Sequence, residues 1–479
     1  MVRFSLLLAF AVHLALWVNA AGGESLAAHR YTVHVDAGLQ RFDIRACFAG
    51  PAPRAVTSRK RGTARYLRLP DRGEALELRG ERLYIRRTGK GNCIEYAVAL
   101  PPYPSGGRWG PFLRTGKSVV LSHHLLLWLP PGHTLPTPIE VDFQLPAGMT
   151  VSAPGTVLSQ VPGRTVFRLG PRPLDWDGRV AIGRFDTVRL DFPGGSAQIA
   201  ILDGKPPARK AETLEWVRKG ADALVMAHGR FPVPAAQVLV IPGGRGGEPV
   251  PWGQVMRGGG DAVHLYIDQT RPLTEFFADW TLVHELSHLL HPRIASDGAW
   301  LSEGLASYYQ NVLRARAGLL DPADAWDRLH AGFQRGIRGT PVDRTLAEVT
   351  ENMMRDRSFM RVYWSGAAIA LLADTGLRYR SDGTQSLDSV LGKLARCCLP
   401  TTRLWGTREL MMQLDTLSDT DVFTTLYARY AHSNHFPDLG EAYRLLGIEA
   451  HGRRLHFDNR APLAATRRAI MAPPSGDAP

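Results

Sequence analysis

The run H-E-L-S-H at residues 284 to 288 constrains this chain more than any other feature, because it lies inside an apolar stretch with helical spacing. One helical turn separates His284 from His288, so both imidazoles lie on the same face and can bind one metal ion. Glu285 lies about 100° round the helix, where a carboxylate can take a proton from a water molecule on that ion. Such an ion lowers the pKa of its water from about 16 towards 7.

A catalytic zinc site needs a third protein ligand, and we expect Glu303 in the segment W-L-S-E-G to supply it. Fourteen residues separate it from His288, and it falls on a second predicted helix at about residues 301 to 317. His291 and Asp297 are rival third ligands, one on the first helix and one in the turn. A second helix holds a ligand rigidly, which favours Glu303. The alternative for the whole run is a buried helix whose histidines bind no metal.

Three segments carry a resemblance to a known group: H-E-L-S-H, W-L-S-E-G-L-A-S-Y-Y (300 to 309) and V-Y-W-S-G-A-A (362 to 368). They resemble the gluzincin metallopeptidases, most closely the M61 glycyl aminopeptidase family and next the M1 aminopeptidases, over roughly residues 208 to 380. The resemblance implies one zinc ion and a thermolysin-like catalytic domain. It implies Glu285 as general base and three zinc ligands, namely His284, His288 and Glu303.

The resemblance also gives Tyr363 a role. It matches a tyrosine that, in those families, donates a hydrogen bond to the tetrahedral oxyanion, where a phenol stabilises charge that develops only in the transition state. The alternative is an ordinary core aromatic. One departure is that the spacing between His288 and Glu303 is shorter than these families usually have.

A glycine-rich run, R-G-G-G-D-A-V-H-L-Y-I (257 to 267), stands where M1 enzymes have a G-x-M-E-N edge strand whose glutamate binds the substrate's α-amine. The M-E-N letters are absent. We expect Gly259 and Gly260 to let a substrate backbone approach, Asp261 to contribute to binding, and the strand at 262 to 267 to pair with an extended peptide. The alternative is a flexible hairpin with a solvated aspartate.

The first twenty residues predict a secretory signal peptide, with Arg3 at a basic start, an apolar run, and Val18 and Ala20 at the small-residue positions of a cleavage site. The alternative is an uncleaved membrane anchor. The signal predicts a periplasmic or secreted protein.

Four cysteines fit such a compartment. Cys47 and Cys93 both fall in a predicted β-rich region and can form a bridge. Cys397 and Cys398 are adjacent, and we do not expect them to pair with each other because of strain. Two free, buried thiols are the alternative there.

The formal net charge is +12, or +11 once a signal carrying Arg3 is removed (12 − 1). The positive residues are dispersed and not interleaved with aromatics, which argues against nucleic-acid binding. The charge is typical of a solvated surface and permits weak contact with anionic envelope surfaces.

The predicted fold class is multidomain α+β. Short alternating runs predict a β-sandwich-like N-terminal domain, in which we expect His123 and His124 to be strand residues and not metal ligands. Helical spacing after residue 210 and a strand at 237 to 241 follow. The expected organisation is a signal at 1–20, the β-rich domain at 21–207, the catalytic domain at 208–395, a helical region at 396–462 and a disordered tail at 463–479.

These features predict a secreted zinc-dependent peptidase that acts on peptides or proteins, with a preference for removing N-terminal residues. Two alternatives stay open. One is a catalytically inactive zinc-containing protein that binds envelope polymers, and the other is a zinc hydrolase of a non-peptide amide.

Overall fold

The computed structural model describes residues 28–474, except 71–74, 87, 89–91, 104–109, 133, 136, 171, 174–175, 208, 244–246 and 453. The predicted signal peptide at 1–20 lies outside the described residues. Within the described part, no helix combines the length and apolar character needed to cross a membrane.

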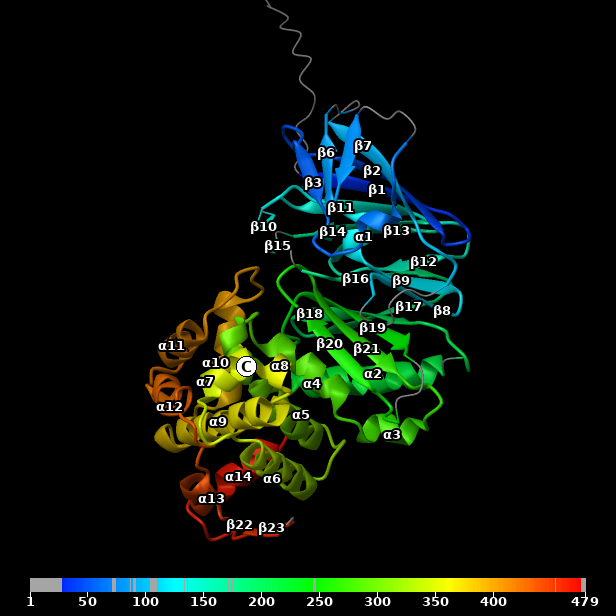
Figure 1. Ribbon diagram of the computed structural model, residues 1–479. Coiled ribbons are helices and arrows are strands. Elements are labelled where there is room, and N and C mark those ends of the chain that lie inside the picture. Colours follow the sequence, from blue (N-terminus) through cyan, green and yellow to red (C-terminus); the bar gives the residue numbers. More distant parts are fainter. Residues whose placement is uncertain are drawn as a thin grey trace, which may run out of the picture.

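The N-terminal part is built from β-sheets that enclose one apolar core (Figure 1). Alternating side chains of its strands point inward, as in β1 (His29–Val35) and β11 (Ile139–Gln144), whose buried and exposed residues alternate. The larger sheet has the order β13-β14-β11-β1-β2-β7-β4 and the smaller one β12-β16-β9-β8. The other strands of these sheets are β2 (Arg41–Cys47), β4 (Leu67–Arg68), β7 (Cys93–Ala99), β8 (Phe112–Thr115), β9 (Ser118–Ser122), β12 (Thr150–Ser152), β13 (Thr156–Val161), β14 (Arg164–Leu169) and β16 (Arg179–Gly183).

Smaller elements complete this part. A three-stranded sheet has the order β3-β6-β5, and β10 pairs with β15. Their bounds are β3 (Ala55–Thr57), β5 (Leu76–Arg79), β6 (Arg82–Ile85), β10 (Thr134–Leu135) and β15 (Arg172–Pro173). The structure corrects the prediction for His123 and His124, which lie on a short helix, α1 (His123–Leu126), and not on a strand. The hydroxyl of Ser122 caps that helix, accepting a hydrogen bond from the His124 amide, so the chain leaves β9 at this point.

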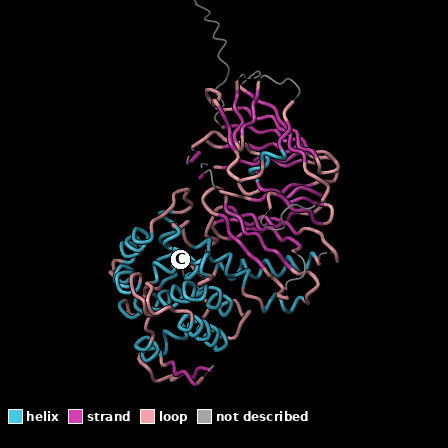
Figure 2. The backbone as a smooth tube through the Cα atoms, in the orientation of Figure 1, coloured by secondary structure: helices cyan, strands magenta, loops and turns pink. Residues whose placement is uncertain are grey.

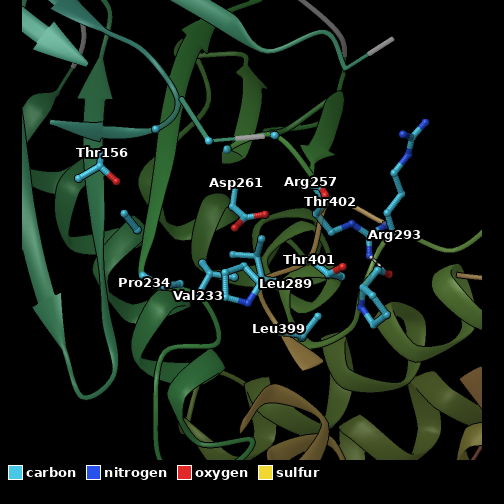
Figure 3. Close-up of a pocket in the computed structure, with 18 of the residues that line it drawn as sticks. Thr156, Val233, Pro234, Arg257, Asp261, Leu289, Arg293, Leu399, Thr401 and Thr402 are labelled. Carbon is cyan, nitrogen blue, oxygen red and sulfur yellow. Dashed lines mark hydrogen bonds between the residues drawn. The ribbon is translucent and has the colours of Figure 1, made fainter. Parts of the chain in front are cut away.

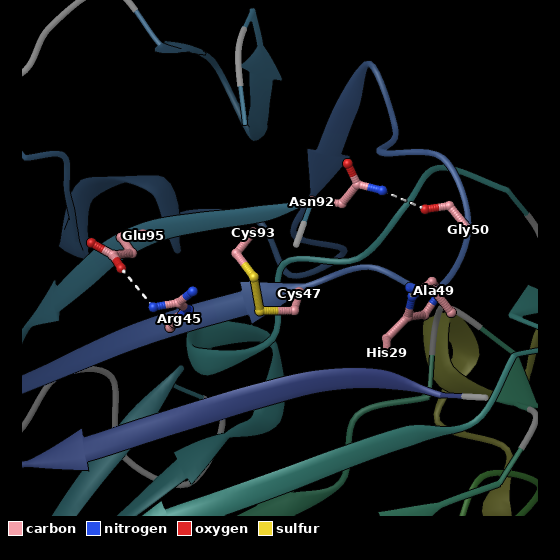
Figure 4. The surroundings of a disulfide bond; sticks show 8 residues. All are labelled: His29, Arg45, Cys47, Ala49, Gly50, Asn92, Cys93 and Glu95. Carbon is pink, nitrogen blue, oxygen red and sulfur yellow. Dashed lines mark hydrogen bonds and ion pairs between the residues drawn. A yellow bond between two sulfur atoms is a disulfide. The ribbon is translucent and has the colours of Figure 1, made fainter. Parts of the chain in front are cut away.

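A disulfide joins Cys47 to Cys93 across β2 and β7, where the two residues face each other in the antiparallel register (Figure 4). Beside it, Arg45 pairs with Glu95 on the same two strands. The structure also joins Cys397 to Cys398, contrary to the expectation that these two do not pair. They are the last two residues of α10 (Leu387–Cys398).

The central sheet has the order β17-β18-β19-β21-β20. Its strands are β17 (Thr187–Phe192), β18 (Gly195–Ile201), β19 (Ala235–Pro242), β20 (Trp252–Met256) and β21 (Asp261–Ile267), with α2 (Lys210–Val225) between β18 and β19. Because β18 pairs with β19, the expected boundary at residue 207 would divide this sheet. We therefore propose a boundary just before Thr187. The strand expected to pair with substrate, β21, has neighbours on both sides, so β20 is the edge strand instead.

The two parts of the molecule pack directly against each other. A small apolar cluster joins Val120 and Ala181 of the four-stranded sheet to Leu239 and Tyr266 of the central sheet. The central sheet lies between the N-terminal sheets and the helices (Figure 2).

The rest of the chain is mostly helical. It comprises α3 (Leu273–Ala278), α4 (Thr281–Ser287), α5 (Ala299–Arg316), α6 (Pro322–Arg338), α7 (Leu346–Glu351), α8 (Met353–Asp356), α9 (Phe359–Arg380), α10, α11 (Thr407–Ser418), α12 (Val422–Tyr430), α13 (Gly440–Leu446) and α14 (Ala464–Met471), with a hairpin of β22 (Ile448–His451) and β23 (Arg454–Phe457). Part of the tail expected to be disordered at 463–479 is ordered, since α14 buries Ile470 and Met471, while residues 475–479 lie outside the described residues.

Helices α5 and α9 cross in close contact, and two glycines make this possible. A Cβ atom on Gly366 would lie 1.8 Å from the carbonyl oxygen of Trp300, and one on Gly304 would lie 2.3 Å from the Gly366 backbone. A side chain at either glycine would push the helices apart. The crossing therefore sets the position of Tyr363, one turn before Gly366, relative to Glu303, next to Gly304.

Candidate active site

Three predicted ligands lie together between α4 and α5. The Nε2 atoms of His284 and His288 lie 3.2 and 3.5 Å from the same oxygen of Glu303. His284 is on α4, and His288 begins the 3₁₀ turn that follows it. The ligand atoms of all three residues lie within 4.8 Å of one another. Two imidazole nitrogens and one carboxylate oxygen are a donor set that zinc prefers, and the residues fit that ion.

The outward nitrogens of both rings have their own partners. Nδ1 of His284 lies 2.8 Å from Oε1 of Gln310. Nδ1 of His288 lies 3.3 Å from the hydroxyl of Ser302, which in turn receives a hydrogen bond from Arg257. Because each Nδ1 is engaged, each Nε2 is left to face Glu303, which is the orientation that metal ligation needs.

Arg257 ties the segment that follows α4 to the central sheet. Its Nη1 atom donates to the carbonyl oxygens of His288, at 2.9 Å, and of Pro292, at 3.1 Å. Burial lowers the pKa of this guanidinium to about 10, although Glu303, Asp261 and Glu285 act in the opposite direction. Arg257 follows β20 directly and therefore links the edge strand to the histidine segment.

Burial and the neighbouring charges together set the charge states of His284, His288 and Glu303. Burial by itself would lower the pKa of His284, but the hydrogen bond to Glu303 and the charges of Glu285 and Glu303 raise it above its usual value. Burial has the larger effect on His288. It lowers the pKa of His288 to about 4, with Glu303 acting in the opposite direction, so this ring is neutral at neutral pH. Burial by itself would raise the pKa of Glu303, but His288 and His284 hold it well below its usual value. A neutral imidazole and an ionised carboxylate are the forms that bind a metal ion.

Glu285 lies beneath the edge strand. A Cβ atom on Gly253 of β20 would lie 2.5 Å from Cγ of Glu285, so only glycine leaves room for this side chain. Burial raises the pKa of Glu285 to about 7, and Glu303 adds to the increase while His284 and Arg257 oppose it. A carboxyl group with a pKa near neutrality can both accept and donate a proton at physiological pH.

Tyr363 approaches the ligand group from α9. Its ring lies parallel to that of His284, with centroids 6.0 Å apart, and Phe359 packs against its edge. Burial raises the pKa of Tyr363, and the carboxylates of Glu303 and Glu285 raise it further, so the phenol keeps its proton. A protonated hydroxyl at this position can donate a hydrogen bond beside the ligand group.

The two rival ligands lie elsewhere. The His291 ring stays beside Arg257, with Nδ1 2.9 Å from Nη1 of that residue. Asp297 accepts a hydrogen bond from Thr407 of α11 and is exposed. Neither belongs to the group of His284, His288 and Glu303.

The glycine-rich run lies beside a different cavity. Gly259, Gly260 and Asp261 line a space of about 340 Å³ between the N-terminal sheets, the segment that follows α4 and the loop at Leu399 to Thr402 (Figure 3). The residues that line it include Arg257 and His291 but none of the three ligand residues. Burial raises the pKa of Asp261 to about 7, against the effect of Arg257.

The structure adds four residues that the sequence analysis missed: Gly253, Arg257, Ser302 and Gln310. Gln310 lies seven residues after Glu303 on the same helix, so helical spacing alone would have placed both on one face. Ser302 is the neighbour of Glu303, and nothing in its sequence context distinguishes it. Arg257 lies within the run that was singled out, but only the fold shows its contacts.

A second group, His123, His124 and Asp177, also brings possible ligand atoms together. Asp177 is already paired with Lys60 at 2.5 Å, and it accepts a hydrogen bond from Ser122. Burial by itself would raise the pKa of Asp177, but Arg179 and Lys60 lower it. Two cations beside this carboxylate oppose the binding of a divalent ion.

Comparisons with known proteins place the fold. No family model matches the sequence. No curated protein matches it either. Among solved structures, an aminopeptidase N family protein from Idiomarina loihiensis matches with a TM-score of 0.65 at 14% identity, covering 88% of this chain and 78% of that chain.

Two more solved structures come from Deinococcus radiodurans. The M1 zinc metallopeptidase matches with a TM-score of 0.51 at 16% identity, covering 86% of this chain and 94% of that chain. A mutant of the M1 zinc metallopeptidase, bound to a Tyr-Ser-Ala substrate, matches with a TM-score of 0.52 at 14% identity, covering 86% and 95%. The chain therefore has the multidomain α+β fold of M1 zinc metallopeptidases.

Proposed function

We propose that this protein is a zinc-dependent peptidase whose single zinc ion is held by His284, His288 and Glu303. The observation that carries the proposal is the convergence of both Nε2 atoms on one oxygen of Glu303, at 3.2 and 3.5 Å. Zinc, when bound, polarises the scissile carbonyl and lowers the pKa of a water molecule. The shared fold with M1 zinc metallopeptidases supports this assignment.

Glu285 and Tyr363 act on the reacting atoms in this proposal. Glu285, with its pKa near neutrality, takes the proton of the attacking water and passes it to the leaving amine. The Tyr363 hydroxyl donates a hydrogen bond to the substrate carbonyl oxygen as that oxygen gains negative charge. Glu285 is buried and Tyr363 is partly buried, so both act in surroundings less polar than bulk water, which strengthens their electrostatic effects.

A peptide is the substrate that the edge strand favours. β20 ends the central sheet, so no strand of the described residues pairs with its outer side, and Gly253 on this strand lies over Glu285. An extended peptide can add to such an edge as a further strand, which lays its amide groups beside the general base. A tripeptide substrate bound to a mutant with the same fold supports this substrate class.

We further propose that the enzyme removes residues from a free N-terminus, with Gly259, Gly260 and Asp261 binding the N-terminal part of the peptide. An aminopeptidase N family protein with the same fold supports this preference. In addition, all three residues line a cavity to which Arg257 also contributes. Arg257 donates a hydrogen bond to the carbonyl oxygen of His288, so the cavity lies close to that residue.

The proposed site of action is the periplasm or the cell exterior. The two disulfides in the described part of the chain support an oxidising compartment.

Incubating the protein with a peptide mixture, with and without a chelator, tests the function by mass spectrometry. Progressive loss of N-terminal residues supports the aminopeptidase, and internal cuts indicate an endopeptidase. Absence of chelator-sensitive cleavage contradicts the proposal and favours a binding protein or a hydrolase of another amide. Glu285→Gln is the control, because it should keep zinc bound and lower turnover by at least about a hundredfold.

A further inference from the structure

A second cavity opens directly beside His284. It has a volume of about 370 Å³, within the range of small-molecule sites, and lies among α5, α6 and α9. Three of the residues that line it lie beside His284. Gln310 is within hydrogen-bond distance of its Nδ1, the Trp280 ring packs edge-on against it, and the Tyr363 ring lies parallel to it. A group bound in this cavity would therefore lie next to the reacting bond.

The cavity carries positive charge without a balancing carboxylate. Arg328 and Arg335 line it from α6, where a spacing of seven residues places both on one face of the helix. None of the described residues that line the cavity is acidic. Among the described residues, neither arginine forms an ion pair with a carboxylate within 4.0 Å, whereas many other surface arginines of the chain do.

The other residues that line the cavity include an aromatic ring and neutral polar side chains, which fit a small polar group. Arg335 is stacked on Trp364, with its guanidinium carbon 4.8 Å from the ring centroid. This contact holds the guanidinium against the ring that lines the cavity. Ser307 and Asn311, one turn apart on α5, add neutral polar groups. The neighbouring Arg314 donates a hydrogen bond to the carbonyl oxygen of Ala278, and its charge is offset by the nearby carboxylate of Asp279.

We propose that this cavity binds a carboxylate on the leaving-group half of the substrate, so that the enzyme prefers short peptides with a free C-terminus. The inference rests on the proposed peptidase function. A guanidinium binds a carboxylate through two parallel hydrogen bonds. Arg328 and Arg335 lie on one wall without a carboxylate partner among the described residues, so a carboxylate of the substrate can bind them. Because the cavity adjoins His284, the C-terminus that reaches the arginines lies only a few residues beyond the scissile bond, so the peptide must be short.

The test compares kcat/KM for Ala-Ala-Ala with that for its C-terminal amide. We expect the free acid to be hydrolysed roughly tenfold faster or more, because a hydrogen bond to a charged carboxylate is stronger than one to a neutral amide. Arg335→Gln and Arg328→Gln should each bring the ratio of acid to amide towards one. Arg338→Gln, an exposed arginine of α6 outside the cavity, is the matched control and should keep the wild-type ratio.

A third peptide, Ala-Asp-Ala amide, distinguishes the source of the carboxylate. A high kcat/KM for this peptide would show that the arginines bind an acidic side chain of the substrate, which contradicts the preference for a free C-terminus. A low value would show that they bind the C-terminal carboxylate. Equal hydrolysis of all three peptides would overturn the inference while leaving the peptidase intact. If no peptide is hydrolysed, the proposed function fails. The inference is then tested by calorimetry, which compares the affinities of the acid and amide peptides for zinc-loaded Glu285→Gln. Equal affinities there would contradict it.

Discussion

Nδ1 of His284 lies 2.8 Å from the side-chain oxygen of Gln310, which is seven residues beyond Glu303 on α5. One helix thus supplies both a candidate ligand and the group that orients another ligand. The neutral ring must carry its proton on Nδ1 to donate to this oxygen, and its Nε2 lone pair is then free for a metal ion.

Gln310→Leu should therefore weaken zinc binding by roughly 10- to 100-fold, because the His284 ring loses its fixed orientation. Competition with a fluorescent chelator measures the affinity. Gln310→Glu, which keeps an acceptor oxygen, is the control and should stay close to the wild type. Unchanged zinc affinity in Gln310→Leu would show that the contact has no orienting role.

Gly253→Ala should lower kcat by roughly a hundredfold while zinc stays bound, because misplacing a catalytic group by about 1 Å costs this much. The added Cβ would lie 2.5 Å from Cγ of Glu285 and must displace it. Gly376→Ala on α9 is the matched control, since its Cβ would meet Val422 at an ordinary 3.6 Å. Steady-state kinetics and metal analysis of both variants check the prediction, which fails if both retain full turnover.

Tyr363→Phe should reduce kcat by about a hundredfold and leave KM and zinc content nearly unchanged, because the hydroxyl acts on charge that exists only in the transition state. The Phe ring can keep the parallel contact with His284. A rise in KM with normal kcat would instead assign the hydroxyl to substrate binding.

Asp261 should make stability depend on pH. Burial raises its folded-state pKa from 3.8 to about 7, so the folded protein holds a proton that the unfolded chain releases near pH 4. Its contribution to stability is therefore full below pH 4 and is lost as the pH rises towards 7, by up to about 1.4 kcal/mol per unit. Asp261→Asn removes this loss, so its melting temperature should exceed that of the wild type at pH 8 by more than at pH 5. An equal difference at both pH values would contradict the shift.

The sequence predicted the helices of the site closely because their signals are local. Apolar spacing and the W-L-S-E-G segment placed the second helix at about 301 to 317, and α5 runs from Ala299 to Arg316. The predicted helix after residue 210 and the strand at 237 to 241 correspond to α2 and β19. Such patterns depend only on neighbours along the chain.

What the sequence could not supply depends on contacts between distant segments. Strand order is one case. β20 and β21 are both short, and their sequences do not indicate which of them is the edge strand. The role of Gly253 follows from that order, since it requires β20 to lie over α4. The hydrogen bonds of Arg257 and Ser302 likewise arise only when β20, α4 and α5 meet.

The ratio of zinc to protein, measured by elemental analysis after exhaustive dialysis, tests the central claim most directly. The account predicts one zinc ion per chain in the wild type and nearly none in Glu303→Ala, because the remaining imidazoles lose the oxygen that both of them face. A wild-type protein without stoichiometric zinc, or a Glu303→Ala variant that keeps its full zinc content, would contradict it.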